Sequence, residues 1–248
     1  MEPITTLLSV FSIGIIAGVI GSMVGGGSLL SISFLIFAGL PPQVAIATDR
    51  FGSVGAAITA FFKFWKAQKI VWKHVPVLAA LSLVGSVIGA NILLNINSDT
   101  LQNIVGVILL VLLPFILLKQ DIGVRRTKMS TLKMGLGLGC YFLVQIFTGF
   151  FGGGTGPIIF YLLMIFFGLT IIEANATQII PVLLLYLSSL VLFALNGIIN
   201  YELGVVLLAG MAIGGYLGAH LAIKKGNAWL KPIFAVVVVA AAIKLLFF

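Results

Sequence analysis

Charged residues are scarce in this sequence. They make up 8% of its 248 residues, whereas hydrophobic residues make up 61% and the mean hydropathy is +1.26. A soluble domain carries about 25% charged residues, and several apolar runs here approach the ~20 residues that a helix needs to cross a bilayer. The short alternating segments of a membrane β-barrel are absent. The sequence therefore predicts an all-α, polytopic protein of the lipid bilayer.

Cysteine and histidine are also rare, with one Cys and two His. A single cysteine excludes an intramolecular disulfide, and in its apolar run Cys140 is expected to be a small buried hydrophobe. The sequence contains no Cys/His metal cluster and no Ser-His-Asp set. We therefore expect neither a cofactor nor an enzymatic function.

The few positive charges are unevenly placed. The net charge is +8, but most lysines and arginines fall in short clusters that flank apolar runs, which is typical of cytoplasmic loops and argues against nucleic acid as a partner. The clusters are Lys63, Lys66, Lys69 and Lys73; Lys119, Arg125, Arg126, Lys128 and Lys133; and Lys224, Lys225 and Lys231.

The sequence is an internal duplication. Two GGG(S/T) runs, at 25–28 and 152–155, are followed in the same order by three further matching pairs: GLPPQVAIAT and GLTIIEANAT, IVW and INY, and GSVIGAN and GGYLGAH. Such ordered self-similarity sets the architecture. We predict an N-terminal repeat at 1–120, a cytoplasmic linker at 121–132 and a C-terminal repeat at 133–248. The Gly pairs in the last match are assigned to close helix packing.

Each half contains five apolar segments, so the second copy is expected to be inverted in the membrane. The segments run roughly 4–24, 28–39, 44–64, 74–95 and 100–118, then 133–151, 155–168, 174–195, 202–222 and 229–247. With both termini extracytoplasmic, all three basic clusters fall in the cytoplasm. The basic loop KFWKAQKIVWK has a repeat partner, FALNGIINYEL, without any Lys or Arg, as an inverted repeat requires under the positive-inside rule.

The two triple glycines predict broken, re-entrant helices. The segment 28–39 would make only about 18 Å of helix, well under the ~30 Å hydrocarbon core. Short, glycine-interrupted segments at matching places in two halves point to a transporter's binding site. Helix N-termini at such corners offer unpaired N–H groups and a positive dipole end. A small oxyanion suits that site, although tight helix packing is the alternative explanation.

Polar residues inside the apolar segments complete the predicted site. ATDRFGS, at 47–53, and its repeat partner ATQIIPV supply hydroxyl, amide and guanidinium groups, and intramembrane ionisable residues are functional candidates by default. An Asp49–Arg50 pair at the helix mouth is the alternative. Glu173 and Asn175 are expected near the surface. The predicted substrate-binding residues are Gly25, Gly26, Gly27, Ser28, Thr48, Arg50, Gly152, Gly153, Gly154, Thr155, Thr177 and Gln178, with Asp49 as a candidate carrier of a coupling proton.

These paired motifs resemble the TauE/SafE sulfite exporter family, also called the TSUP family. The resemblance covers essentially the whole chain and departs from the family pattern at Asp49, where Asn or Ser is expected. It implies a multi-pass protein of the prokaryotic inner membrane whose substrate is a small sulfur-containing anion, such as sulfite, thiosulfate or an organosulfonate. The predicted function is a secondary transporter, most simply an exporter, that works by alternating access.

Two other functions remain open at this level. An anion or solute channel would line an open path with the same glycine corners. A membrane enzyme or assembly factor would have only Asp49, Cys140, His74 and His220 as reactive candidates. The sequence leaves the oligomeric state open.

Overall fold

The computed structural model describes residues 3–95, 123, 126–230 and 233. The described chain folds into α-helices and contains no strand. The helices are α1 (Pro3–Val24), α2 (Gly27–Phe37), α3 (Pro42–Lys66), α4 (Val75–Asn95), α6 (Thr131–Phe150), α7 (Thr155–Phe167), α8 (Ile171–Leu195) and α9 (Tyr201–Lys225). The predicted segments 100–118 and most of 229–247 lie outside the described residues.

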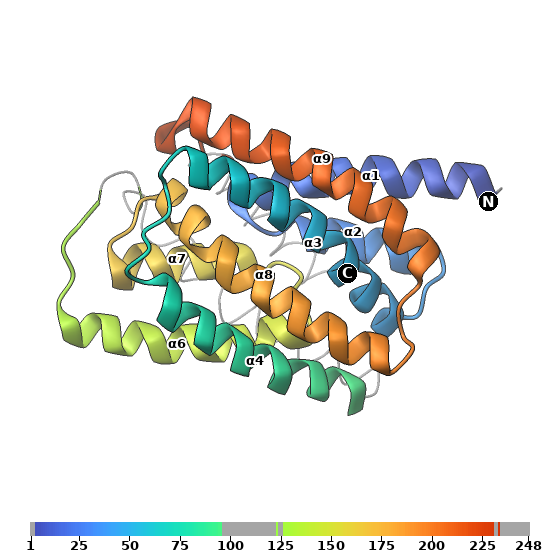
Figure 1. Cartoon of the computed structure of the whole chain (residues 1–248), viewed down its shortest axis with the longest axis horizontal. Helices are drawn as coiled ribbons and strands as arrows, with labels where there is room; N and C mark the ends of the chain where they lie inside the picture. The colour runs from blue at the N-terminus through green and yellow to red at the C-terminus, as the bar shows by residue number, and fades with distance from the viewer. Residues whose placement is uncertain (1–2, 96–122, 124–125, 231–232, 234–248) are drawn as a thin grey trace.

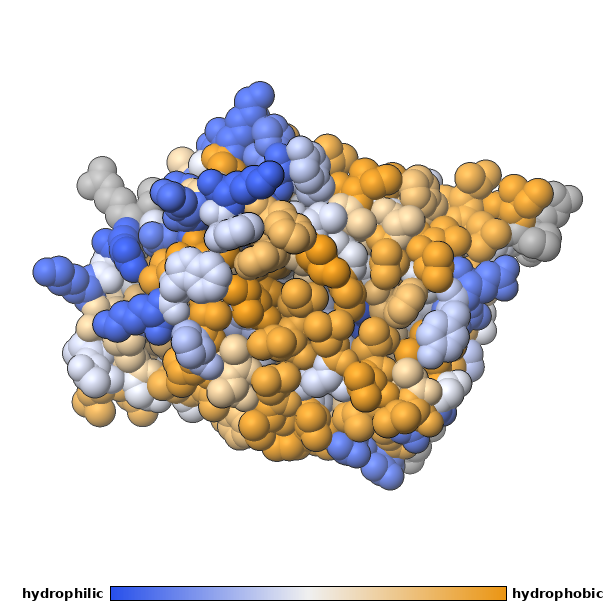
Figure 2. All heavy atoms as spheres, in the orientation of Figure 1, coloured by the Kyte–Doolittle hydropathy of each residue, from blue (hydrophilic) through white to orange (hydrophobic). Residues whose placement is uncertain are grey.

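Five of these helices are long and apolar enough to cross a membrane: α1, α4, α6, α8 and α9. Helix α3 is as long as the longest of them but carries buried polar residues, Thr48 to Ser53, in its N-terminal half. Large apolar side chains cover the outer face of the bundle (Figure 2), as expected where lipid is the solvent. The prediction of an all-α polytopic membrane protein is confirmed.

The helix contacts repeat between the two halves of the chain. Helix α9 packs along α1 and α3, α4 packs along α6 and α8, and α3 contacts α8. In Figure 1, α1, α3 and α9 run in one direction along the bundle, whereas α6, α8 and α4 run in the other. These directions are the ones that an inverted repeat requires, and the repeat itself stays a prediction.

Glycines bring the long helices into backbone contact. A Cβ on Gly89 of α4 would meet the carbonyl oxygen of Ile146 in α6, and one on Gly214 of α9 would meet that of Ile15 in α1. Gly85 and Gly218 are similarly enclosed. The assignment of these Gly pairs to helix packing is confirmed.

The described basic residues outside the core gather at one end of the bundle. They lie in the last turn of α3 and the loop after it, around the start of α6, and in the last turn of α9, which places them together at the left of Figure 2. The described residues of the predicted linker lie at the same end, where the N–H of Thr127 donates to the carbonyl of Gly168 and that of Ile171 donates to the carbonyl of Gly123. One expectation was wrong: Cys140 is exposed on α6, because its helical position faces away from the neighbouring helices.

Candidate functional site

Both triple glycines break a helix. Gly25 and Gly26 separate α1 from α2 with φ angles of 79° and 85°, and Gly152 and Gly154 separate α6 from α7 with φ angles of 76°. Glycine adopts this left-handed region without the Cβ clash of other residues. The helices that follow have 11 and 13 residues, or roughly 17 and 20 Å. The predicted short helices are confirmed.

The two corners meet at their backbones. A Cβ on Gly25 would lie 2.7 Å from the Cα of Gly156, and a Cβ on Gly156 would lie 2.6 Å from the Cα of Gly25. Real side chains do not approach this closely, so both positions require glycine for space, and Gly25 requires it for its φ as well. The two corners, which are far apart in the sequence, are therefore in direct backbone contact in the folded protein.

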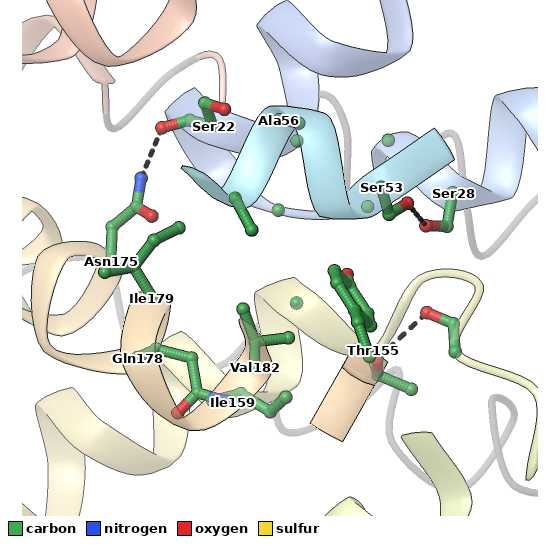
Figure 3. A pocket seen from close by; sticks show the side chains of 18 of the residues that line it. Ser22, Ser28, Ser53, Ala56, Thr155, Ile159, Asn175, Gln178, Ile179 and Val182 are labelled. Carbon is green, nitrogen blue, oxygen red and sulfur yellow. Dashed lines mark hydrogen bonds between the residues drawn. The ribbon is translucent and has the colours of Figure 1, made fainter. Parts of the chain in front are cut away.

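A cavity of about 90 Å³ lies where the corners meet (Figure 3). The predicted site residues that line it are Gly25, Gly26, Gly27, Ser28, Gly152, Thr155 and Gln178. The lining does not include Gly153, Gly154, Thr48, Asp49, Arg50 or Thr177. On the scale of protein cavities this space holds a few water molecules or a comparably small solute.

Hydroxyl and amide groups from several helices face this cavity. Ser28 of α2 and Ser53 of α3 lie 3.4 Å apart, Oγ to Oγ, and the Thr155 hydroxyl donates to the Gly152 carbonyl at 3.0 Å. Gln178 accepts from the Tyr141 hydroxyl at 2.7 Å, while its Nε2 has no hydrogen-bond partner among the described residues. The cavity wall therefore offers donors from both halves.

Asn175 lines the cavity, so the expectation that it lies near the surface was wrong. Its side chain is 3% exposed and its Nδ2 donates to the carbonyls of Ser22, at 2.5 Å, and Met23, at 3.2 Å. Those carbonyls belong to the last turn of α1, where helical partners run out. Asn175 thus ties the broken end of α1 to α8, which is why it is buried rather than at the surface.

Arg50 lies directly behind the cavity wall. Its side chain is 1% exposed, its Nη2 donates to the Thr148 carbonyl, and its guanidinium lies 5.1 Å from the centre of the Tyr186 ring. A Cβ on Gly152 would collide with the guanidinium. Thr148, Gly152 and Tyr186 all line the cavity. Nε and Nη1 of Arg50 have no hydrogen-bond partner among the described residues.

Asp49 is buried next to Arg50 without pairing with it. Its carboxylate accepts hydrogen bonds from Ser31 of α2 and from Ser53, the latter at 3.4 Å. No ion pair joins Asp49 and Arg50, whereas Arg126 and Glu173 do form one at the surface, at 3.9 Å. The helix-mouth pair that was the alternative explanation for these residues is therefore not formed.

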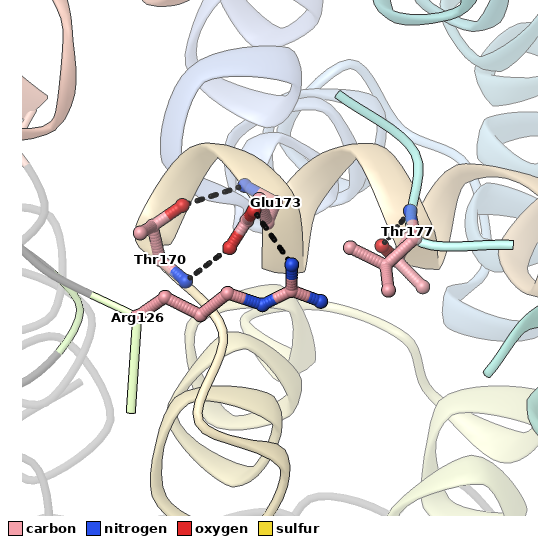
Figure 4. A network of polar contacts seen from close by, with 5 residues as sticks. Arg126, Thr170, Glu173 and Thr177 are labelled. Carbon is pink, nitrogen blue, oxygen red and sulfur yellow. Dashed lines mark hydrogen bonds and ion pairs between the residues drawn. The ribbon is translucent and has the colours of Figure 1, made fainter. Parts of the chain in front are cut away.

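Thr48 and Thr177 lie at the ends of the bundle instead. Thr48 Oγ1 accepts from the Asn200 N–H at 3.1 Å, and Thr177 Oγ1 accepts from the Val71 N–H at 3.0 Å. Figure 4 shows Thr177 near the capping box of α8, in which Thr170 and Glu173 satisfy each other's backbone N–H groups. Neither Thr48 nor Thr177 lines the cavity, so their predicted role in substrate binding has no support there and stays a prediction.

The lining residues that sequence reasoning missed include Ser53, Tyr186 and Asn175. Ser53 could have been found, because it lies one helical turn after Asp49 and so shares its face of α3. Nothing local distinguishes Tyr186 or Asn175 in the sequence. Their positions depend on how α8 packs against the corners.

Comparison with known proteins agrees with this architecture. The family model for the sulfite exporter TauE/SafE matches residues 10–245. A probable membrane transporter protein of Haemophilus influenzae is 26% identical, with 94% of this chain and 91% of the relative covered. The probable membrane transporter protein YfcA of Escherichia coli K12 is 28% identical, with 96% and 88% covered. No solved structure matches significantly. The chain belongs to the sulfite exporter TauE/SafE family.

Proposed function

We propose that this protein is a secondary transporter that exports a small sulfur-containing anion through the cavity between its two glycine corners. The family and the relatives named as membrane transporters support transport and point away from an enzyme. One structural observation carries the anion assignment: behind the wall of the cavity, Nε and Nη1 of the buried Arg50 have no hydrogen-bond partner in the part of the chain that the structure describes. A buried guanidinium whose N–H groups lack acceptors is energetically costly unless a bound anion accepts hydrogen bonds from them.

The helix ends add to the positive potential of the cavity. Gly26 and Gly154 are the N-caps of α2 and α7, and neither helix start is capped by a side chain. Helix N-termini carry partial positive charge and unsatisfied N–H groups, which is why they bind anions elsewhere. Together with the positive charge of Arg50, two such ends favour an anion over a cation or a neutral solute.

The repeat supplies a mechanism. We interpret α1–α4 and α6–α9 as inverted-topology copies that rock against each other, so that the cavity opens alternately to each side. The end that carries the basic clusters is then cytoplasmic, and both termini are extracytoplasmic, in the inner membrane of a prokaryote. An interior-negative potential favours anion export by about 2.3 kcal/mol per charge for each 100 mV.

The proposal is tested by ligand-induced stabilisation of the purified protein. A thermal-shift screen would compare sulfite, thiosulfate, sulfate, taurine and sulfoacetate with acetate and succinate as carboxylate controls. A ligand that binds only the folded state raises its stability, so we expect a shift with at least one sulfur anion and none with the carboxylates. Counterflow in proteoliposomes would then separate a transporter from a channel. No binding or flux of any sulfur anion would overturn the proposal.

A further inference from the structure

Asp49 is the one carboxyl group buried within the described helices. Its side chain is fully buried, whereas the other described acidic residues, Glu173 and Glu202, lie in the first turns of α8 and α9. Intramembrane carboxyl groups are expensive to keep and mark ion or proton pathways. The alternating-access mechanism proposed for this protein does not use Asp49, so the burial of its carboxyl group needs an explanation of its own.

Hydroxyl groups, rather than cations, hold Asp49. Ser31 from α2 and Ser53 from the next turn of α3 both donate to it. The charged and titratable groups that face it are Arg50, on its own helix, and Tyr186, from α8. Arg50 directs its guanidinium to Thr148 and Tyr186 and makes no ion pair with Asp49. The carboxyl group is therefore free to exchange a proton without breaking a salt bridge.

A chain of hydroxyls connects this carboxyl group to the cavity. Ser53 Oγ lies 3.4 Å from Asp49 Oδ2 and 3.4 Å from Ser28 Oγ. Ser28 and Ser53 both line the cavity, and Figure 3 shows their hydroxyls turned toward each other at its edge. A hydroxyl is both donor and acceptor, so each serine can accept a proton on one side and pass one on at the other.

Charge balance then links proton and anion. The charges of Asp49 and Arg50 cancel when both groups are ionised. An anion that accepts hydrogen bonds from the Arg50 guanidinium therefore gives this part of the protein a net negative charge. A like charge nearby disfavours an ionised carboxylate. Protonation of Asp49 restores neutrality, and by linkage the anion and the proton each strengthen the binding of the other.

We infer that Asp49 is the proton-coupling site of this protein, reached from the cavity through Ser28 and Ser53. The inference rests on the proposed anion transport. A proton from the solution on one side forms an O–H bond with the Asp49 carboxylate, by relay through the two serine hydroxyls, when the anion enters. The same O–H bond breaks and the proton leaves by the relay when the anion departs on the other side. A divalent anion that moves with one proton still carries one net negative charge outward, so the interior-negative potential still favours its export.

The test is to count protons taken up on anion binding. Titration calorimetry of the purified protein in two buffers of different ionisation enthalpy gives that count. The probes are thiosulfate, sulfate and methanesulfonate, which keep a fixed charge around neutral pH and so contribute no proton of their own. We expect about one proton taken up per anion, and a Kd that rises by about tenfold per pH unit where Asp49 is ionised in the free protein.

Variants separate this inference from the proposed function. Asp49→Asn should bind the anion with no proton uptake and no pH dependence, whereas Glu202→Gln, which removes a carboxyl group at the end of the bundle, should match the wild type. Ser53→Ala should retain uptake at equilibrium but slow pH-driven flux in proteoliposomes. Anion binding by the wild type without proton uptake would overturn the coupling alone. Failure of all three probes to bind would overturn the coupling and count against anion transport as well.

Discussion

Thr48 and Thr177 make the same hydrogen bond at opposite ends of the bundle. Each threonine hydroxyl, in an early turn of its helix, accepts from a backbone N–H in a loop of the other half: Asn200 for Thr48 and Val71 for Thr177. Thr177 follows Thr48 by 129 residues, and Asn200 follows Val71 by 129 residues. The pair thus fastens the start of α3 to the α8–α9 loop and the start of α8 to the α3–α4 loop.

Removing either hydroxyl should loosen only the loop it holds. Thr48→Val and Thr177→Val keep the side-chain shape and each should cost about 1 kcal/mol of stability, as for a single net hydrogen bond. Hydrogen exchange should speed up at the Asn200 amide in the first variant and at the Val71 amide in the second. Thr48→Ser and Thr177→Ser keep the acceptor and serve as controls. Unchanged exchange at both amides would show that these bonds do not fasten the loops.

Gly25 should tolerate alanine far less well than a glycine in an open turn. Gly25→Ala adds a Cβ in a left-handed conformation and against the backbone of Gly156. Gly197→Ala is matched, since its φ of 66° is also left-handed but its Cβ would meet nothing within 4 Å. We expect a loss of about 1–2 kcal/mol for Gly197→Ala and a further 1–3 kcal/mol for Gly25→Ala from overpacking. Thermal unfolding in detergent measures both, and equal losses would mean that the corners do not meet so closely.

Arg50 should govern anion affinity through its geometry as well as its charge. Arg50→Met removes the hydrogen bonds of a charged donor, worth about 1.5–3 kcal/mol, so affinity should fall by roughly 10- to 150-fold. Arg50→Lys keeps the charge but loses the planar guanidinium and its stacking on Tyr186. Its anion affinity should lie between those of Arg50→Met and the wild type. Lys66→Met removes an exposed cation as a control. Calorimetry with the anion found in the screen provides the values; wild-type affinity in Arg50→Met would remove Arg50 from the site.

His74 should make stability depend on pH at the basic end of the bundle. Burial, followed by the positive charges of Lys73 and Arg126, lowers the pKa of His74, and its ring packs edge-on against Phe167 at 5.2 Å. The unfolded chain, with an ordinary pKa of about 6.5, binds the proton more tightly than the folded protein. Stability is therefore complete above pH ~6.5 and is lost as the pH falls below it. Thermal unfolding across this range should show the loss in the wild type and a flatter profile in His74→Gln; identical profiles would contradict the assignment.

The class of fold, the two helix breaks and the grouping of the basic residues are all predictable from the amino-acid sequence. Those features follow from local properties: the apolar runs match the thickness of a bilayer, and the glycine runs are where a helix stops most readily. The packing roles of Gly85, Gly89, Gly214 and Gly218 were also predictable, because small residues four apart form one face of a helix.

Which polar groups meet at the cavity depends on how the helices pack and is not predictable from the sequence. Arg50 reaches Gly152 and Thr148 across about a hundred residues of sequence, and Asn175 reaches the end of α1 in the same way. Helical periodicity fixes which face of its own helix a side chain occupies. The packing of α3 and α8 against the two corners fixes what that face meets, and this is why Ser53 lines the cavity while Thr48, five residues earlier on the same helix, holds a loop.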